Sequence, residues 1–158
     1  MPTAHHSAAV AAPVEALWAR LAGIESWPRW LLVPYASESV TIASPGPTAV
    51  GTEFVLKGRM KARLFARITE LEDRRRLAFE IYRSEYPSDR LFFGRASISI
   101  ELETVDAARA RITCTHRLEG KGAIGKLYAA VVMRPFLAVN VQRIVDSLVA
   151  AVGDTARR

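Results

Sequence analysis

Hydrophobic and polar residues alternate through the middle of the chain, a pattern typical of half-buried β-strands. The alternation is clearest over Phe92–Leu102 and Ala110–Leu118, where every second residue except His116 is small or apolar and the residues between them are mostly polar or charged. The same period of two occurs in four earlier segments: Ser37–Ala43, Thr52–Lys57, Met60–Ile68 and Leu77–Ile81. We therefore expect an antiparallel sheet with one face on the core.

Helical spacing replaces the alternation near the beginning of the chain. A short strand is expected over His5–Ala12, and Pro13 then suits the first turn of a helix. Apolar residues at helical intervals predict that this helix continues to Gly23. A second short helix or turn is expected around Ser26–Trp30.

The last part of the chain predicts one long helix over residues 123–152. Pro135 lies inside it and should bend it, because proline removes a hydrogen bond and its ring clashes with the preceding turn. Asn140 and Ser147 are assigned to its polar side. Its apolar stripe is formed by Leu137, Val141, Ile144, Val145, Leu148 and Val152.

This order of elements favours an α+β fold in which a curved antiparallel sheet wraps its apolar face around the long helix. Neither a repeat nor a linker interrupts the pattern, so residues 1–158 are expected to form a single domain. The helix is much longer than a typical strand. Its N-terminal half is therefore expected to arch over the sheet and leave an apolar pocket.

Composition and charge limit the classes of function. Half of the residues are hydrophobic, and the single cysteine, Cys114, excludes an internal disulfide and suits a reducing, cytoplasmic environment. Neither a secretory signal nor a charge-free apolar run of about 18 residues is evident. The net charge of +6 favours acidic partners, but the densest basic run, Arg74–Arg76, follows acidic residues in a predicted turn. No nucleic-acid partner is expected.

Three short segments resemble a known family. Ala12–Trp18, Trp27–Trp30 and Gly51–Phe54 are similar to segments of the START-like (SRPBCC) superfamily, nearest to its polyketide cyclase/dehydrase and lipid-transport branch. The resemblance covers essentially the whole chain. It implies a helix-grip fold, in which a seven-stranded antiparallel sheet grips the C-terminal helix around a hydrophobic cavity. Members bind lipids, polyketides, plant hormones or quinones, and some catalyse aromatisation or cyclisation.

The inward faces of the predicted strands and helices supply candidate ligand-binding residues. His116 and Tyr128 combine an apolar body with a polar tip, and either could transfer a proton. A structural role for His116, bonded to a backbone carbonyl, is the alternative. The full predicted lining consists of Trp30, Phe54, Leu56, Leu64, Phe79, Ile81, Phe92, Ile98, His116, Leu118, Tyr128, Val132 and Phe136. Trp30, Tyr128 and the bend at Pro135 are expected to shape the entrance.

Other chemistry finds little support in the sequence. Cys114 and His116 share a strand face, but zinc needs further ligands of the same kind, and the adjacent His5 and His6 point to opposite faces. No Gly-x-Ser-x-Gly motif is present, and Gly120–Gly122 lacks the spacing of a phosphate-binding loop. No metal, cofactor or nucleotide site is predicted.

A basic stripe marks a second candidate surface. Lys57, Arg59, Lys61, Arg63 and Arg67 share odd positions and could contact anionic lipid headgroups. The alternative is a solvated outer face whose cations pair with Glu101 and Glu103 on neighbouring strands.

The leading hypothesis is a carrier that buries a small hydrophobic molecule such as a lipid, polyketide or isoprenoid. One alternative is a polyketide aromatase/cyclase that uses His116 or Tyr128 for proton transfer in the same cavity. Another is a protein-interaction module whose cavity is closed. Both a monomer and a homodimer formed through the exposed sheet remain open.

Overall fold

Seven antiparallel strands form one open sheet in the computed structural model, which describes residues 2–156 and the side chains of residues 2–153. The strands are β1 (Thr3–Val10), β2 (Ser39–Ile42), β3 (Glu53–Lys57), β4 (Arg63–Glu72), β5 (Arg76–Ser84), β6 (Phe93–Asp106) and β7 (Arg109–Gly120). Their order across the sheet is β1-β7-β6-β5-β4-β3-β2, and every neighbouring pair is antiparallel. The chain thus places its first strand beside its last, and the seven-stranded sheet is confirmed.

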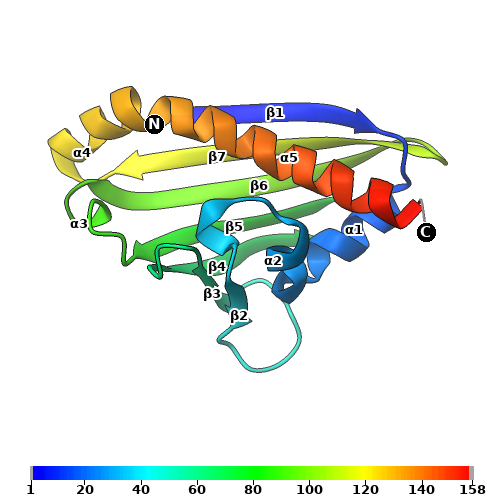
Figure 1. Ribbon diagram of the computed structural model, residues 1–158, viewed down its shortest axis with the longest axis horizontal. Coiled ribbons are helices and arrows are strands. Elements are labelled where there is room, and N and C mark those ends of the chain that lie inside the picture. The colour runs from blue at the N-terminus through cyan, green and yellow to red at the C-terminus, as the bar shows by residue number, and fades with distance from the viewer. Residues whose placement is uncertain (1, 157–158) are drawn as a thin grey trace.

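Helical segments connect and cover the strands. The chain forms α1 (Val14–Ala22), η1 (Ile24–Ser26), α2 (Trp27–Trp30), η2 (Pro34–Ala36), α3 (Asp89–Phe92), α4 (Gly122–Tyr128), η3 (Ala129–Met133) and α5 (Arg134–Ala156). The last three form one continuous helix that lies across the sheet (Figure 1). Helix α5 packs against β1, β7 and α1, as the sheet-around-helix arrangement predicts.

The long helix contains an irregularity at its centre. Segment η3 is a π-helix, and it ends two residues before Pro135. Proline lacks the N–H that would bond the Val131 carbonyl, and its ring crowds that carbonyl in a regular α-helix. A wider π turn accommodates this break in the hydrogen-bond ladder. Segments α4 and α5 run in different directions in Figure 1, so the expected bend lies in the π-helical turn that precedes Pro135.

The apolar stripe of α5 is buried as predicted, but the assignment of its polar side is partly wrong. Asn140 and Ser147 are each only 3% exposed. Both lie three residues after a stripe residue, at Leu137 and Ile144, and this spacing places them on the edge of the buried face. Ser147 accepts a hydrogen bond from the Leu32 backbone and donates one to the Arg143 carbonyl.

Several boundaries differ from the sequence-based ranges. Met60–Ala62 belong to the turn before β4, where Lys61 has a φ of 58°. Strand β4 continues through Glu72, so the charged turn is confined to Asp73–Arg75, where Arg74 has a φ of 60°. Segments η2 and α3 have too few residues to show periodicity in a sequence, and they were not expected.

The helix from Gly122 to Gly153 is long and apolar enough, by length and composition alone, to cross a membrane. In the fold, however, 44% of its most apolar stretch is buried against the rest of the molecule. Core packing therefore explains part of its apolar character. Other apolar residues of the helix are exposed on α4, on η3 and at the start of α5.

Candidate ligand-binding site

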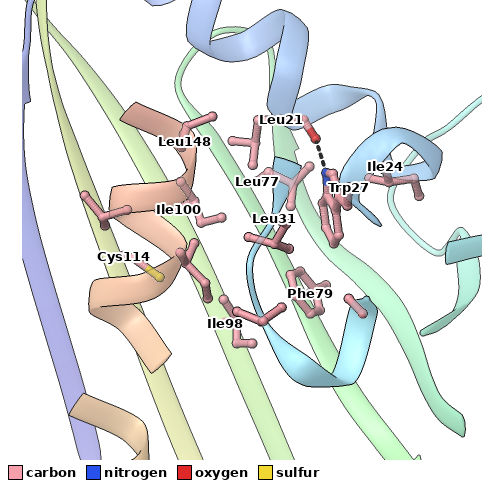
Figure 2. Close-up of a cluster of buried hydrophobic side chains, with 14 of the residues drawn as sticks. Leu21, Ile24, Trp27, Leu31, Leu77, Phe79, Ile98, Ile100, Cys114 and Leu148 are labelled. Carbon is pink, nitrogen blue, oxygen red and sulfur yellow. Dashed lines mark hydrogen bonds between the residues drawn. The ribbon is translucent and has the colours of Figure 1, made fainter. Parts of the chain in front are cut away.

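The interior of the molecule is divided into a packed half and an open half. In the packed half, the ring centroid of Trp27 lies 5.8 Å from that of Phe54 and 5.5 Å from that of Phe79. The Trp27 indole donates a hydrogen bond to the Leu21 carbonyl, drawn in Figure 2 among the surrounding aliphatic side chains. The void left between these groups is about 10 Å³, too small for a ligand.

The open half contains a cavity of about 360 Å³ beneath the N-terminal part of the long helix. This volume lies within the range of small-molecule sites. Side chains from the sheet, the loops and the helix contribute to its walls. The lining residues are Pro34, Tyr35, Arg59, Met60, Leu64, Ile81, Tyr86, Ser88, Asp89, Phe93, Ala96, His116, Leu118, Tyr128, Met133, Phe136 and Leu137.

Close backbone contacts position two parts of this wall. Gly58 packs directly on η2, and a Cβ placed on it would lie 2.0 Å from the Pro34 carbonyl oxygen. On the opposite side, a Cβ on Gly120 would lie 2.0 Å from the Gly125 carbonyl oxygen. Only glycine permits these approaches. The first contact holds Tyr35 against the β3–β4 turn, and the second holds α4 against the end of β7.

His116 is a buried polar residue that lines the cavity. It projects from β7, is only 5% exposed, and its Nδ1 lies 3.1 Å from the side-chain nitrogen of Asn140 on α5. The Asn140 amide, as the donor, requires Nδ1 to accept, so the ring proton resides on Nε2. Burial lowers the pKa of His116 to about 4. The imidazole is therefore neutral near pH 7, and its Nε2–H group is not used in the bond to Asn140.

Tyr35 separates the open cavity from the small void and lines both. Its hydroxyl is buried without a hydrogen-bond partner among the described residues. Burial raises the pKa of Tyr35 strongly, and the neighbouring Asn140 side chain opposes that shift only in part. The hydroxyl therefore stays protonated. Tyr35 and His116 both lie beside the side-chain amide of Asn140.

A second polar group lies on the wall formed by the β5–β6 connection. Asp89 lines the cavity and accepts a hydrogen bond from the Ser84 hydroxyl. Burial raises the pKa of Asp89, while the bond from Ser84 acts in the opposite direction. Burial and then the charge of Asp89 raise the pKa of the nearby Tyr86. This wall therefore combines a carboxyl group with a protonated phenol.

The structure separates the thirteen predicted lining residues into groups. Leu64, Ile81, His116, Leu118, Tyr128 and Phe136 line the open cavity. Trp30, Leu56, Phe79 and Ile98 instead surround the small void, and Phe54 packs in the core beside it. Phe92 stacks on Tyr128 with centroids 4.4 Å apart and does not line the cavity.

Val132 lies outside the cavity for a structural reason. Regular α-helical spacing from Tyr128 would place residue 132 on the same face, four residues later. The π turn has one more residue per hydrogen-bonded ring, so Met133 takes the inward position and Val132 is 54% exposed. The sequence-based assignment of Val132 to the lining is therefore wrong.

The basic stripe is largely neutralised by neighbouring carboxylates. Lys57 pairs with Glu38, Arg63 with Glu85, and Arg67 with Glu80. The expectation that Glu101 and Glu103 supply these partners is wrong, because β5 lies between β4 and β6 and Glu101 pairs with Arg76. The stripe therefore offers few free cations to an anionic membrane.

Some contributors to the site were not predicted from the sequence. Tyr35 lies in a segment without periodicity. Met60 belongs to the alternating segment Met60–Ile68 but is not among the predicted lining residues, and Asn140 is assigned to the polar side of the long helix. The spacing of Asn140 from Leu137 and Ile144 was the available signal for its burial. Residues 2–153 contain no cluster of three or more metal-ligating side chains of the His, Cys, Asp and Glu types.

Comparison with solved structures defines the class of this fold. A START superfamily protein from Mycobacterium smegmatis matches with a TM-score of 0.69 and 11% identity over 97% of this chain and 98% of that one. Norcoclaurine synthase from Thalictrum flavum, solved with dopamine and hydroxybenzaldehyde, matches with a TM-score of 0.72 and 14% identity over 96% and 86% of the two chains. The fold is START-like, as the resemblance implied.

The sequence places the protein within that class. The chain belongs to the polyketide cyclase/dehydrase and lipid transport family, whose profile matches residues 1–153. The di-domain aromatase/cyclase BexL from the BE-7585A biosynthetic pathway matches with a TM-score of 0.69 and 19% identity. That match covers 94% of this chain and 46% of BexL. No curated protein matches the sequence.

Proposed function

We propose that this protein binds a small, mainly hydrophobic molecule that carries a hydrogen-bond acceptor such as a carbonyl oxygen. The observation that carries the proposal is the cavity of about 360 Å³, which His116 lines with one unused N–H. Burial of apolar surface supplies the driving force for binding, and a single polar contact orients the ligand. Carriage of such a molecule between cellular sites is the leading role.

The polar contact gives the site a chemical preference. A neutral imidazole held by Asn140 donates through Nε2 to an oxygen without the cost of burying a charge. A ligand without an acceptor would leave this N–H unpaired. The site therefore favours ketones, quinones and polyketide-like chains over pure hydrocarbons, by about two- to tenfold for one neutral hydrogen bond.

Cyclisation of a polyketide is the second candidate function, and the lining of the cavity favours it. His116 and Tyr128 border the same space, so a folded chain could meet both polar tips. The His116 N–H would polarise a carbonyl group, as neutral imidazoles do in other enzymes. Confinement of the chain would supply most of the rate enhancement. A protein-interaction module with a closed cavity is not supported, because the cavity is open.

The decisive experiment compares two probes of similar shape, 2-acetonaphthone and 2-ethylnaphthalene, by isothermal titration calorimetry. Wild-type protein should bind the ketone more tightly. The His116→Phe variant should bind both equally, and Ala96→Phe, which fills the cavity from β6, should bind neither. An Ala107→Phe control in the exposed β6–β7 turn should behave as wild type. Equal affinity of wild type for the two probes, or full binding by Ala96→Phe, would overturn the proposal.

A further inference from the structure

The outer side of α4 and η3 is apolar, although a helix on the surface of a soluble protein normally exposes polar residues there. Ile124 is 73% exposed, and Leu127 and Val131 are each 65% exposed. Their spacing of three and four residues places them along one side of the helix. On the inner side, Gly125 and Ala129 are buried against the sheet.

Helix α3 extends this apolar surface. It packs against α4, where the Phe92 and Tyr128 rings stack and the Lys121 backbone donates to the Phe92 carbonyl. Leu91 on α3 is 71% exposed. The α3 and α4 helices lie together at one end of the molecule, opposite the β6–β7 turn (Figure 1). We call the exposed side chains of Leu91, Ile124, Leu127 and Val131 the α4 surface.

Cations without carboxylate partners surround the α4 surface. Lys121, immediately before α4, is exposed, and so are Lys126 and Arg134 on the helix and Arg90 on α3. Among the described residues, none of these four forms an ion pair, whereas arginines on the sheet such as Arg63, Arg67 and Arg76 do. The sequence has no acidic residue between Gly120 and Val145. The end of the molecule thus combines exposed aliphatic groups with free positive charge.

This combination matches the surface of an anionic phospholipid bilayer. Amphipathic helices lie in the membrane interface with aliphatic side chains among the acyl chains and Lys or Arg at the headgroups. The α4 surface has no exposed tryptophan or tyrosine of the kind that dominates protein–protein contacts. We propose that the protein docks on anionic membranes through the α4 surface, with Lys121, Lys126, Arg90 and Arg134 contacting the headgroups.

The docked orientation would bring the cavity close to the bilayer. Tyr128 and Phe136, on either side of η3, line the cavity, and the exposed Met60 lines it as well. A hydrophobic molecule would then travel a short path between the membrane and the protein. The docking itself requires only the α4 surface, so it can be tested independently of ligand binding.

The test is flotation of the purified chain with vesicles of phosphatidylcholine alone or with about one third phosphatidylglycerol. We expect binding to the anionic vesicles to be at least about tenfold tighter and to be lost near 0.5 M NaCl. The Ile124→Ser/Leu127→Ser variant should bind roughly tenfold more weakly or worse. Lys121→Gln/Lys126→Gln should show a similar loss.

Matched variants control for surface hydrophobicity and for net charge. Val105→Ser changes an exposed apolar residue at the opposite end of the molecule, and Arg111→Gln/Arg117→Gln removes two exposed charges from β7. Both should bind vesicles within about twofold of wild type, because surface changes away from the contact have small effects. Circular dichroism and thermal melts confirm that each variant is folded.

Direct insertion is measured with an environment-sensitive dye on Leu127→Cys, since the natural Cys114 is fully buried and inaccessible. A blue shift with anionic vesicles is expected. Absence of vesicle binding, or equal losses in the control variants, would overturn the proposal. It would also be overturned if wild type sediments as a dimer that Ile124→Ser/Leu127→Ser converts to a monomer, since a second copy would then cover the α4 surface.

Discussion

The side-chain nitrogen of Asn140 lies 3.1 Å from Nδ1 of His116, and this bond connects the long helix to the strand that it crosses. Both residues are nearly inaccessible to solvent. The bond satisfies one polar atom of each residue in the core. It also fixes the orientation of the imidazole, whose other ring nitrogen, Nε2, is not used in this bond. Stability and ligand orientation therefore depend on the same pair.

Burial of His116 makes the stability of the protein sensitive to acid. Its folded-state pKa of about 4 lies below the ordinary value of 6.5, so the unfolded chain binds the proton more readily. The free energy of unfolding should consequently fall as the pH decreases from 6.5 to about 4. The shift corresponds to a loss of about 3 kcal/mol at most.

Urea denaturation across this pH range tests the effect. The difference in stability between wild type and His116→Gln should shrink as the pH falls, because only the wild type must protonate a buried imidazole. His5→Gln, at an exposed site, should follow the wild-type curve. A constant difference between wild type and His116→Gln would show that His116 titrates normally.

Removal of the Asn140 amide should lower the stability of the protein, and the His116 ring should no longer be held in one tautomer and orientation. We expect Asn140→Ala to lower the free energy of unfolding by about 1–3 kcal/mol, because Nδ1 is left buried without a donor. Nitrogen NMR shifts of His116 should move from a single neutral tautomer toward a mixture of both. Ser147→Ala, further along the same buried face of α5, should destabilise the protein while leaving the His116 tautomer unchanged.

The sequence predicts the regular parts of this fold because each regular element repeats one physical pattern many times. Strand β7 alternates over its whole length, β6 alternates from Arg95 to Leu102, and the α5 stripe recurs at helical spacing. Segment η2, which carries Tyr35, contains three residues and has no period to detect. Its position depends on the close approach of Gly58, which is a tertiary contact.

Prediction of the site was limited by two other effects. Alternation identifies which residues point inward but not which end of the interior is filled, so Phe79 and Ile81 were equivalent in the sequence. The Trp27 ring fills the space beside Phe79 and leaves Ile81 facing the cavity. The π turn then shifts the inward position from Val132 to Met133, a change that regular helical spacing does not anticipate.

Substitution by alanine should lower the stability of the protein at Gly58 and raise it at Gly153. At Gly58 the added methyl group would collide with the Pro34 carbonyl, so η2 must move, at a cost of about 1–3 kcal/mol. At Gly153 nothing lies within 4 Å, so alanine should stabilise α5 by about 0.5–1 kcal/mol through its helix propensity. Thermal melts of the two variants show whether each substitution raises or lowers the stability. A neutral Gly58→Ala would mean that the β3–β4 turn is not packed on η2.

Phe79 and Ile81 provide a final test of the division between packed core and open cavity. Both lie on the inner face of β5, and both are buried. Phe79→Ala should destabilise the protein by about 3–5 kcal/mol, because the Trp27 and Phe54 rings would lose their partner. Ile81→Ala should cost less, about 2 kcal/mol, since this side chain already borders empty space. Binding of 2-acetonaphthone should show the reverse order, with the larger change for Ile81→Ala. If Phe79→Ala altered ketone affinity more than Ile81→Ala at a temperature where both are folded, the ligand would occupy the half of the interior that we describe as filled.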